Sequence, residues 1–146
     1  MAVRADTEEI GELLARREEA NRAYFERHAE DLARLCHRMA ERFARGGRLI
    51  AVGLSPGARS DVRHVTVEFV HPVIVGKRAL PAIGLTRDGG PLRRQAELLV
   101  GPDDIVIAFD PHGEGAVEVR AAVALGRERG ALTVAFEAGA GAEWEG

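Results

Sequence analysis

Apolar residues recur with helical spacing from the start of the chain up to the pair Gly46 and Gly47. The spacing predicts one long helical region, because residues three and four apart share a helix face and a glycine pair is a typical helix end. The stripe consists of Ile10, Leu13, Leu14, Ala20, Tyr24, Phe25, Leu32, Leu35, Cys36, Met39 and Phe43.

An unbroken helix over these residues would be roughly 50 Å long. A domain of this size has a radius of gyration of only roughly 14–15 Å. We therefore expect the helix to bend near Asn21 or to pack on another subunit, because Tyr24, Phe25 and Leu32 would otherwise face water. Residues 1–46 are interpreted as an oligomerisation region that gives a homo-oligomer, either a dimer or a tetramer.

After Gly47 the pattern changes to short, continuous apolar runs at 49–52, 82–85, 105–109 and 132–136. Runs of this kind are typical of strands buried on both faces. Helical patterns at about 59–70, 92–100 and 116–129 separate them. The alternation predicts an α/β fold in residues 47–146, with a parallel four-stranded sheet and helices on both faces. The tail after the fourth run carries no predicted element.

Composition excludes several classes of function. The chain has 146 residues and a net charge of -3, so its net charge does not favour binding to nucleic acid or to an anionic membrane. There is no cationic leader and no apolar run long enough to span a bilayer, and we expect a cytoplasmic protein. The single cysteine, Cys36, falls on the apolar stripe and is expected to be a buried small hydrophobe.

Two loops carry the candidate chemistry: "GLSPGARS" after the first run and "DPHGEG" after the third. In the helix that follows the first loop, His64 and Glu68 are four apart and share a face. Together with Asp110 and His112 they could form a tetrahedral zinc site with an open position. The alternative is an ordinary Asp-Pro turn and an exposed ion pair.

Serines near a helix start usually cap it. Ser60, just ahead of an apolar helical run, is expected to be the cap, whereas Ser55 could contact a ligand or serve as a cap.

Three other parallel-sheet families fit the sequence less well. A P-loop needs a lysine after its glycines, and "GLSPGARS" has none. The dinucleotide fingerprint G-x-G-x-x-G is absent. A receiver domain needs acidic residues after the first strand, and none are present there.

Five segments in order, "FARGGRLIAVG", "DVRHVTVEFV", "RALPAIGLT", "GPDDIVIAF" and "VRAAVALGRERGALTVAF", resemble the sugar isomerase (SIS) domain and its phosphoheptose isomerase branch. The resemblance implies a flavodoxin-like strand order in which the first and third strands are neighbours. The two loops would then line one crevice at the topological switch point. The resemblance also implies a tetramer built through the N-terminal helix.

In this family the first loop reads G-N-G-G-S and the second S-T-S-G-N-S, and their amides and hydroxyls hold a sugar phosphate. The resemblance therefore implies phosphate contacts from Gly53, Ser55, Gly57, Ser60, His112 and Gly113. The loops here depart from that pattern. Pro56 has no amide hydrogen to donate, and Asp110, Pro111 and His112 replace the hydroxyls of the second loop.

The family pattern D-x-x-H-x-x-x-E is matched by Asp61, His64 and Glu68. By resemblance, Glu68 is the base that moves a proton between two carbons of an aldose–ketose pair, and His64 assists or binds zinc. No cofactor is required, although zinc is possible. The family's fifth strand and final helix have no counterpart in the sequence, which resembles a C-terminally shortened member.

Two hypotheses follow. In the first, the protein is a phosphosugar isomerase with Glu68 and His64 at its site. In the second, it is a non-catalytic SIS-like oligomer for binding or assembly that keeps the fold and has lost the phosphate site.

Overall fold

The computed structural model describes residues 7–137 and 141–145. Continuous apolar runs form the strands, and amphipathic stretches between them form the helices. In chain order the elements are α1 (Thr7–Ala44), β1 (Leu49–Val52), α2 (Pro56–Val70), β2 (Ala82–Leu85), α3 (Leu92–Leu99), β3 (Ile105–Phe109), α4 (Ala116–Glu128), β4 (Leu132–Glu137) and β5 (Gly141–Glu145).

The strands form one sheet in the order β2-β1-β3-β4-β5. The first four strands are parallel, so both the predicted parallel sheet and its flavodoxin-like order are confirmed. β5 adds an antiparallel edge strand whose backbone pairs with β4 between Thr133 and Glu137. The sequence does not predict this strand, because Gly141–Glu145 contains no apolar run.

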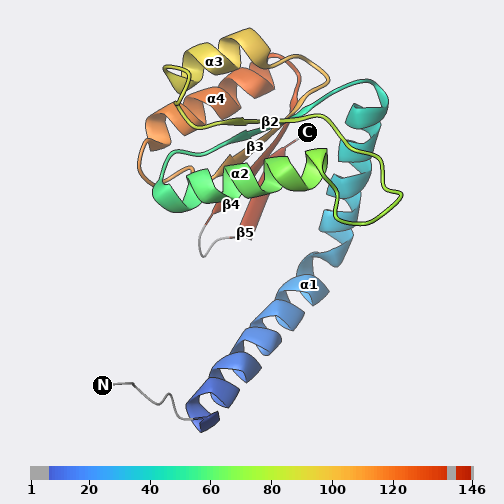
Figure 1. Cartoon of the computed structure of the whole chain (residues 1–146), viewed down its shortest axis with the longest axis vertical. Helices are drawn as coiled ribbons and strands as arrows, with labels where there is room; N and C mark the ends of the chain where they lie inside the picture. The colour runs from blue at the N-terminus through green and yellow to red at the C-terminus, as the bar shows by residue number, and fades with distance from the viewer. Residues whose placement is uncertain (1–6, 138–140, 146) are drawn as a thin grey trace. The chain divides into compact units, whose positions relative to one another are not determined.

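Helices cover both faces of the sheet. α2 lies on one face, and α3 and α4 lie on the other (Figure 1). Ile50, Val52, Val106 and Ala108 of the central strands are fully buried, as expected for strands covered on both sides. This layering leaves the carboxyl ends of β1, β2 and β3 together at one edge of the sheet.

α1 crosses the boundary between two compact units, residues 1–37 and 38–146. It stays helical through Asn21 without interruption. Cys36 is exposed, so the expectation of a buried thiol is wrong for the single chain. Residues 38–45 belong to the second unit, where Phe43 packs on Phe69 with ring centroids 5.7 Å apart.

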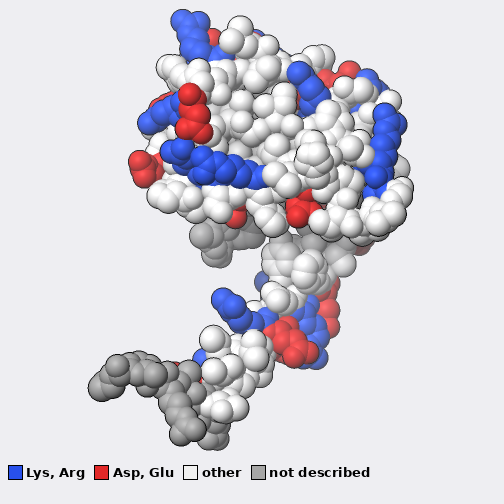
Figure 2. Space-filling view, viewed as in Figure 1, with Lys and Arg blue, Asp and Glu red and all other residues white. Residues whose placement is uncertain are grey.

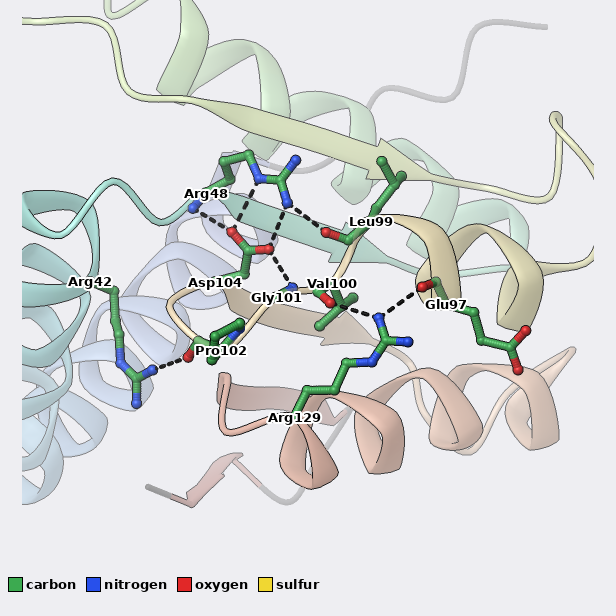
Figure 3. A network of polar contacts seen from close by, with 9 residues as sticks. All are labelled: Arg42, Arg48, Glu97, Leu99, Val100, Gly101, Pro102, Asp104 and Arg129. Atoms are coloured by element: carbon green, nitrogen blue, oxygen red, sulfur yellow. Dashed lines mark hydrogen bonds and ion pairs between the residues drawn. The ribbon is translucent and has the colours of Figure 1, made fainter.

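The amino ends of the strands are held by a polar network around Asp104 (Figure 3). Its carboxylate accepts bonds from Arg48 Nη2 at 2.8 Å, from the Arg48 backbone N–H at 2.8 Å and from the Gly101 N–H at 2.7 Å. Arg129 donates to the carbonyls of Glu97 and Val100 at the end of α3. This edge of the sheet is therefore committed to structure.

Charge on the α/β unit is mixed. On the face shown in Figure 2, basic and acidic side chains lie next to one another where α2 begins, and neither sign covers the face. Within the described ranges, no helix is long and apolar enough to cross a membrane.

Candidate functional site

The loops after β1 and β3 touch each other at the carboxyl edge of the sheet. The close approach depends on Gly115, which has a φ of 74° and packs against Leu54. A Cβ on Gly115 would lie 2.5 Å from Leu54 Cδ1, so a larger residue would force the loops apart. The two loops therefore meet at the switch point, where open parallel sheets bind ligands.

The first loop is used mainly to start α2. Ser55 is the N-cap, and its Oγ accepts the N–H of Ala58 at 3.3 Å. Pro56 occupies the first helical position, where its missing N–H costs no helical hydrogen bond. The prediction that Ser60 caps the helix is wrong: Ser60 lies within the helix and is exposed.

The two glycines of this loop differ in surroundings. Gly53 is buried, and a Cβ there would come within 2.8 Å of the Ala58 side chain. Gly57 is exposed in the first turn of α2 and has open space around it. Gly53 thus serves close packing of the strand end on the helix.

The second loop is a closed turn. Asp110 has a φ of 52°, and the N–H of Gly113 donates to its carbonyl at 3.1 Å. The Asp110 carboxylate lies over Gly113, where any Cβ would overlap it. Arg120 Nη1 donates to the Pro111 carbonyl at 2.9 Å and holds the turn in place. His112 is exposed.

His64 and Glu68 lie side by side on the outer surface of α2. Their Nε2 and Oε1 atoms are 3.7 Å apart, and the side chains are 78% and 43% exposed. Val62, which faces the core, is fully buried. His64 lies about 200° further round the helix, so the pair points away from the sheet.

The tentative zinc set of His64, Glu68, Asp110 and His112 does not converge within one chain. Among the described residues, no group of three or more His, Cys, Asp or Glu side chains could hold a metal ion. The reason is geometric, because the first two side chains point outward from α2 and the Asp110 carboxylate folds over its own turn.

A pocket of about 330 Å³ opens where the two loops meet. Leu54 and Pro56 give it an apolar wall, Arg59 and Arg63 come from the first two turns of α2, and Glu114 comes from the second loop. The pocket therefore presents two guanidinium groups and one carboxylate beside an apolar surface. An anion with hydroxyl groups would match it, since guanidinium binds oxyanions and a carboxylate accepts from hydroxyls.

The loop after β2 reaches the same arginines. Asp88 Oδ1 lies 2.9 Å from Arg59 Nη2, and Asp88 Oδ2 lies 3.7 Å from Arg63 Nη2. The hydroxyl of buried Thr86 donates to Oδ2 at 2.5 Å. This hydrogen bond and the two guanidiniums lower the pKa of Asp88, which keeps the carboxylate ionised.

The same loop is tied to the other face of the sheet. Arg87, with a φ of 69°, forms an ion pair with Glu118 in the first turn of α4. Glu118 also accepts the N–H of Leu92 at 3.2 Å. The hydrogen bond from Arg87 lowers the pKa of Glu118. The loop thus contacts α2 through Asp88 and α4 through Arg87.

Arg59, Arg63 and Asp88 are absent from the sequence-based list of site residues. That list follows glycines and hydroxyls, which is how the family holds phosphate. The available signals are two arginines four apart, one at the end of the first loop and one just beyond it, and an acid shortly after a strand that neighbours β1.

No protein-family model matches the chain. Several curated relatives are phosphoheptose isomerases. The one from Pelobacter propionicus is 34% identical over 132 residues, covering 79% of this chain and 69% of the relative. The one from a Roseiflexus species is 32% identical over 136 residues, covering 84% and 68%. The one from Solidesulfovibrio magneticus is 30% identical over 128 residues, covering 79% and 62%.

The aligned part of the chain thus spans 62–69% of the length of these three relatives. Among solved structures, a phosphoheptose isomerase from Neisseria gonorrhoeae superposes with a TM-score of 0.71 at 20% identity, over 88% of this chain and 72% of that one. This structural likeness supports the fold, whereas membership of the family rests on the sequence identities. The chain belongs to the phosphoheptose isomerase family.

Proposed function

We propose that this protein binds a phosphorylated sugar in the pocket between the loops after β1 and β3. The pair Arg59 and Arg63 in that pocket carries the proposal, because it supplies positive charge at the place where parallel sheets bind ligands. Glu114 offers an acceptor for sugar hydroxyls on the other side of the pocket. The names of the relatives support a phosphosugar as the ligand class.

The mode of binding differs from the one expected from the family's loops. Pro56 cannot donate a backbone hydrogen, and Ser55 is occupied as the cap of α2. Arginine side chains therefore take the role that amides and hydroxyls have in the family pattern. Guanidinium groups suit it, since they present paired donors to phosphate oxygens.

The chemistry that fits this ligand is aldose–ketose isomerisation. In that reaction Glu68 removes a proton from the hydroxyl-bearing carbon beside the carbonyl and returns it to the carbonyl carbon, while the hydroxyl proton passes to the carbonyl oxygen, so no net oxidation and no redox cofactor are needed. The support is the spacing of Asp61, His64 and Glu68 in the sequence. Because His64 and Glu68 face outward in one chain, a second subunit would have to cover them during turnover.

The second candidate is a non-catalytic, phosphosugar-binding oligomer. The observation that favours it is the exposure of the His64–Glu68 pair, which leaves Glu68 in contact with water. Both candidates share the pocket and differ only in what Glu68 does.

Sedoheptulose 7-phosphate tests the binding that both candidates share. At 100 times its dissociation constant a ligand adds about 2.7 kcal/mol to the free energy of unfolding. For a chain of this length that raises the Tm by about 5–10 °C. A wild-type protein that shows no shift and no heat of binding with this sugar would contradict the proposed function.

Glu68→Gln separates the two candidates. If Glu68 is the base, the variant loses turnover by at least about 100-fold and no longer exchanges the sugar's carbon-bound hydrogen with D₂O, while sugar affinity is retained. Glu128→Gln, on the exposed end of α4, is the matched control and should keep both. Wild-type protein that binds the sugar without exchange or turnover would establish the non-catalytic alternative.

A further inference from the structure

Asp88 occupies a binding position for an anion. Its two carboxylate oxygens face different donors: Oδ1 faces Arg59, and Oδ2 faces Arg63 and the Thr86 hydroxyl. These donors come from α2 and from the end of β2, two elements that pack against each other. A negatively charged group with two oxygens on one central atom is therefore already bound there, and it belongs to the protein itself.

A phosphate monoester presents the same arrangement of oxygens with more charge. Guanidinium groups bind carboxylate and phosphate through the same paired N–H donors. Arg59 and Arg63 also line the pocket, so each can reach either Asp88 or a ligand. The two anions compete for one pair of side chains.

Asp88 is able to leave. Its side chain is 63% exposed, so a displaced carboxylate moves directly into water. Exposed ion pairs are weak because water and salt compensate the separated charges. Its neighbour Arg87 has a positive φ, an uncommon conformation for a residue with a side chain, and is paired with Glu118 on the far side of the loop.

We propose that Asp88 is an internal competitor for the phosphate site: a phosphorylated ligand binds Arg59 and Arg63 by displacing the Asp88 carboxylate, and the 86–91 loop is thereby released from α2. This inference rests on the proposed function for the identity of the ligand, but not for the site itself. Ligand binding and the position of this loop are coupled by the exchange, because two anions that face the same Nη2 atoms of Arg59 and Arg63 repel each other.

Three variants test the exchange with inorganic phosphate as the probe, measured by NMR titration at low ionic strength. Asp88→Asn keeps the side chain's shape and its hydrogen bond to Thr86 but removes the competing charge, so phosphate binds about two- to fivefold more tightly. Arg59→Gln combined with Arg63→Gln weakens phosphate binding by at least about tenfold.

Glu97→Gln is the matched control. Glu97 on α3 is likewise held by two arginines, Arg93 at 2.9 Å and Arg94 at 3.2 Å, but it lies outside the pocket. Its loss removes the same charge from the protein and should leave phosphate affinity unchanged. If Glu97→Gln changes phosphate affinity as much as Asp88→Asn does, the effect is explained by the protein's net charge alone and the proposal is overturned.

The loop supplies a second readout. In wild-type protein, phosphate shifts the Nε–Hε signals of Arg59 and Arg63 and the backbone amide signals of Gly89 and Gly90. In Asp88→Asn the arginine signals still shift, whereas those of the loop, already released, hardly move. Phosphate affinity that falls or stays constant in Asp88→Asn overturns the exchange.

Sedoheptulose 7-phosphate, used in parallel, separates this inference from the proposed function. If inorganic phosphate behaves as expected and the sugar does not bind, the exchange is supported and the sugar assignment fails. If the sugar binds wild type and the double arginine variant equally well, the ligand class survives and the exchange is overturned.

Discussion

A single carboxylate, Asp104, organises the edge of the sheet opposite the pocket. The residue is 4% exposed, and its carboxylate oxygens accept hydrogen bonds from the Arg48 side chain and from two backbone N–H groups. Burial alone would raise the pKa of Asp104, but the bonds from Arg48 and from the Gly101 N–H outweigh it and lower the pKa below its ordinary 3.8. Asp104 is thus fully committed to holding the turn between α3 and β3.

Asp104→Asn should cost about 2–4 kcal/mol of the free energy of unfolding, because it leaves Arg48 without its charge partner and removes an acceptor. The Tm should fall by about 5–15 °C in a calorimetric scan. Asp103→Asn is the control, because that neighbouring carboxylate is 47% exposed and pairs with Arg45 at the surface, so its loss should cost less than about 1 kcal/mol.

The pH dependence of stability follows from the same residue. The folded protein binds the Asp104 proton more weakly than the unfolded chain does, so the contribution of Asp104 is complete above the ordinary pKa of 3.8. It is lost as the pH falls through the lowered pKa of the folded state. The difference in stability between wild type and Asp104→Asn should therefore narrow below pH 3.8, and a constant difference would contradict this account.

At the scale of elements, α2 links the first loop to the pocket. Its first turn carries the cap Ser55 and Pro56, and its next residues include Arg59 and Arg63. The start of the helix therefore sets the direction in which both guanidiniums project. A helix that frays at this end would lose the anion site before it loses the fold.

Ser55→Ala should destabilise the protein by about 1 kcal/mol, because the N–H of Ala58 loses its acceptor. That corresponds to a fall in Tm of about 2–4 °C. Ser60→Ala is the matched control within the same helix and should stay within about 0.5 kcal/mol of wild type, since alanine is a better helix former and Ser60 is not the cap. Equal losses in the two variants would refute the assignment of Ser55 as the cap.

The elements are largely predictable from the sequence, whereas the site is predictable only in position. Strands β1 to β4 follow directly from continuous apolar runs, because burial on both faces excludes polar residues. The sequence-based prediction places the cap of α2 at Ser60 and not at Ser55, because the apolar pattern becomes visible only after Ser60. Arg59, Arg63 and Asp88 come together through the strand order, and spacing along the chain does not reveal which charged side chains reach one another.

At the scale of the whole molecule, residues 7–37 of α1 form a helix that keeps much of its apolar stripe in water. Ile10 and Leu13 are 45% and 47% exposed, and Leu14 and Phe25 are 60% and 57% exposed. Helices without tertiary partners are marginally stable in water, and exposed apolar surface of this extent usually marks an interface. Cys36, exposed in one chain, lies on the same predicted stripe.

A second copy of the chain is the partner we expect on this stripe, so wild-type protein should sediment as a dimer or tetramer. Phe25→Asp should shift it to monomers and reduce the helical signal in circular dichroism, because a charge on the stripe opposes burial and the released helix is only marginally stable. Leu98→Asp is the control, since Leu98 is 85% exposed on α3 and its replacement should leave the mass unchanged. A monomeric wild type, or a Phe25→Asp variant that keeps the wild-type mass, would rule out assembly through this stripe. A second subunit would then no longer be available to cover His64 and Glu68, and the non-catalytic candidate would become the stronger one.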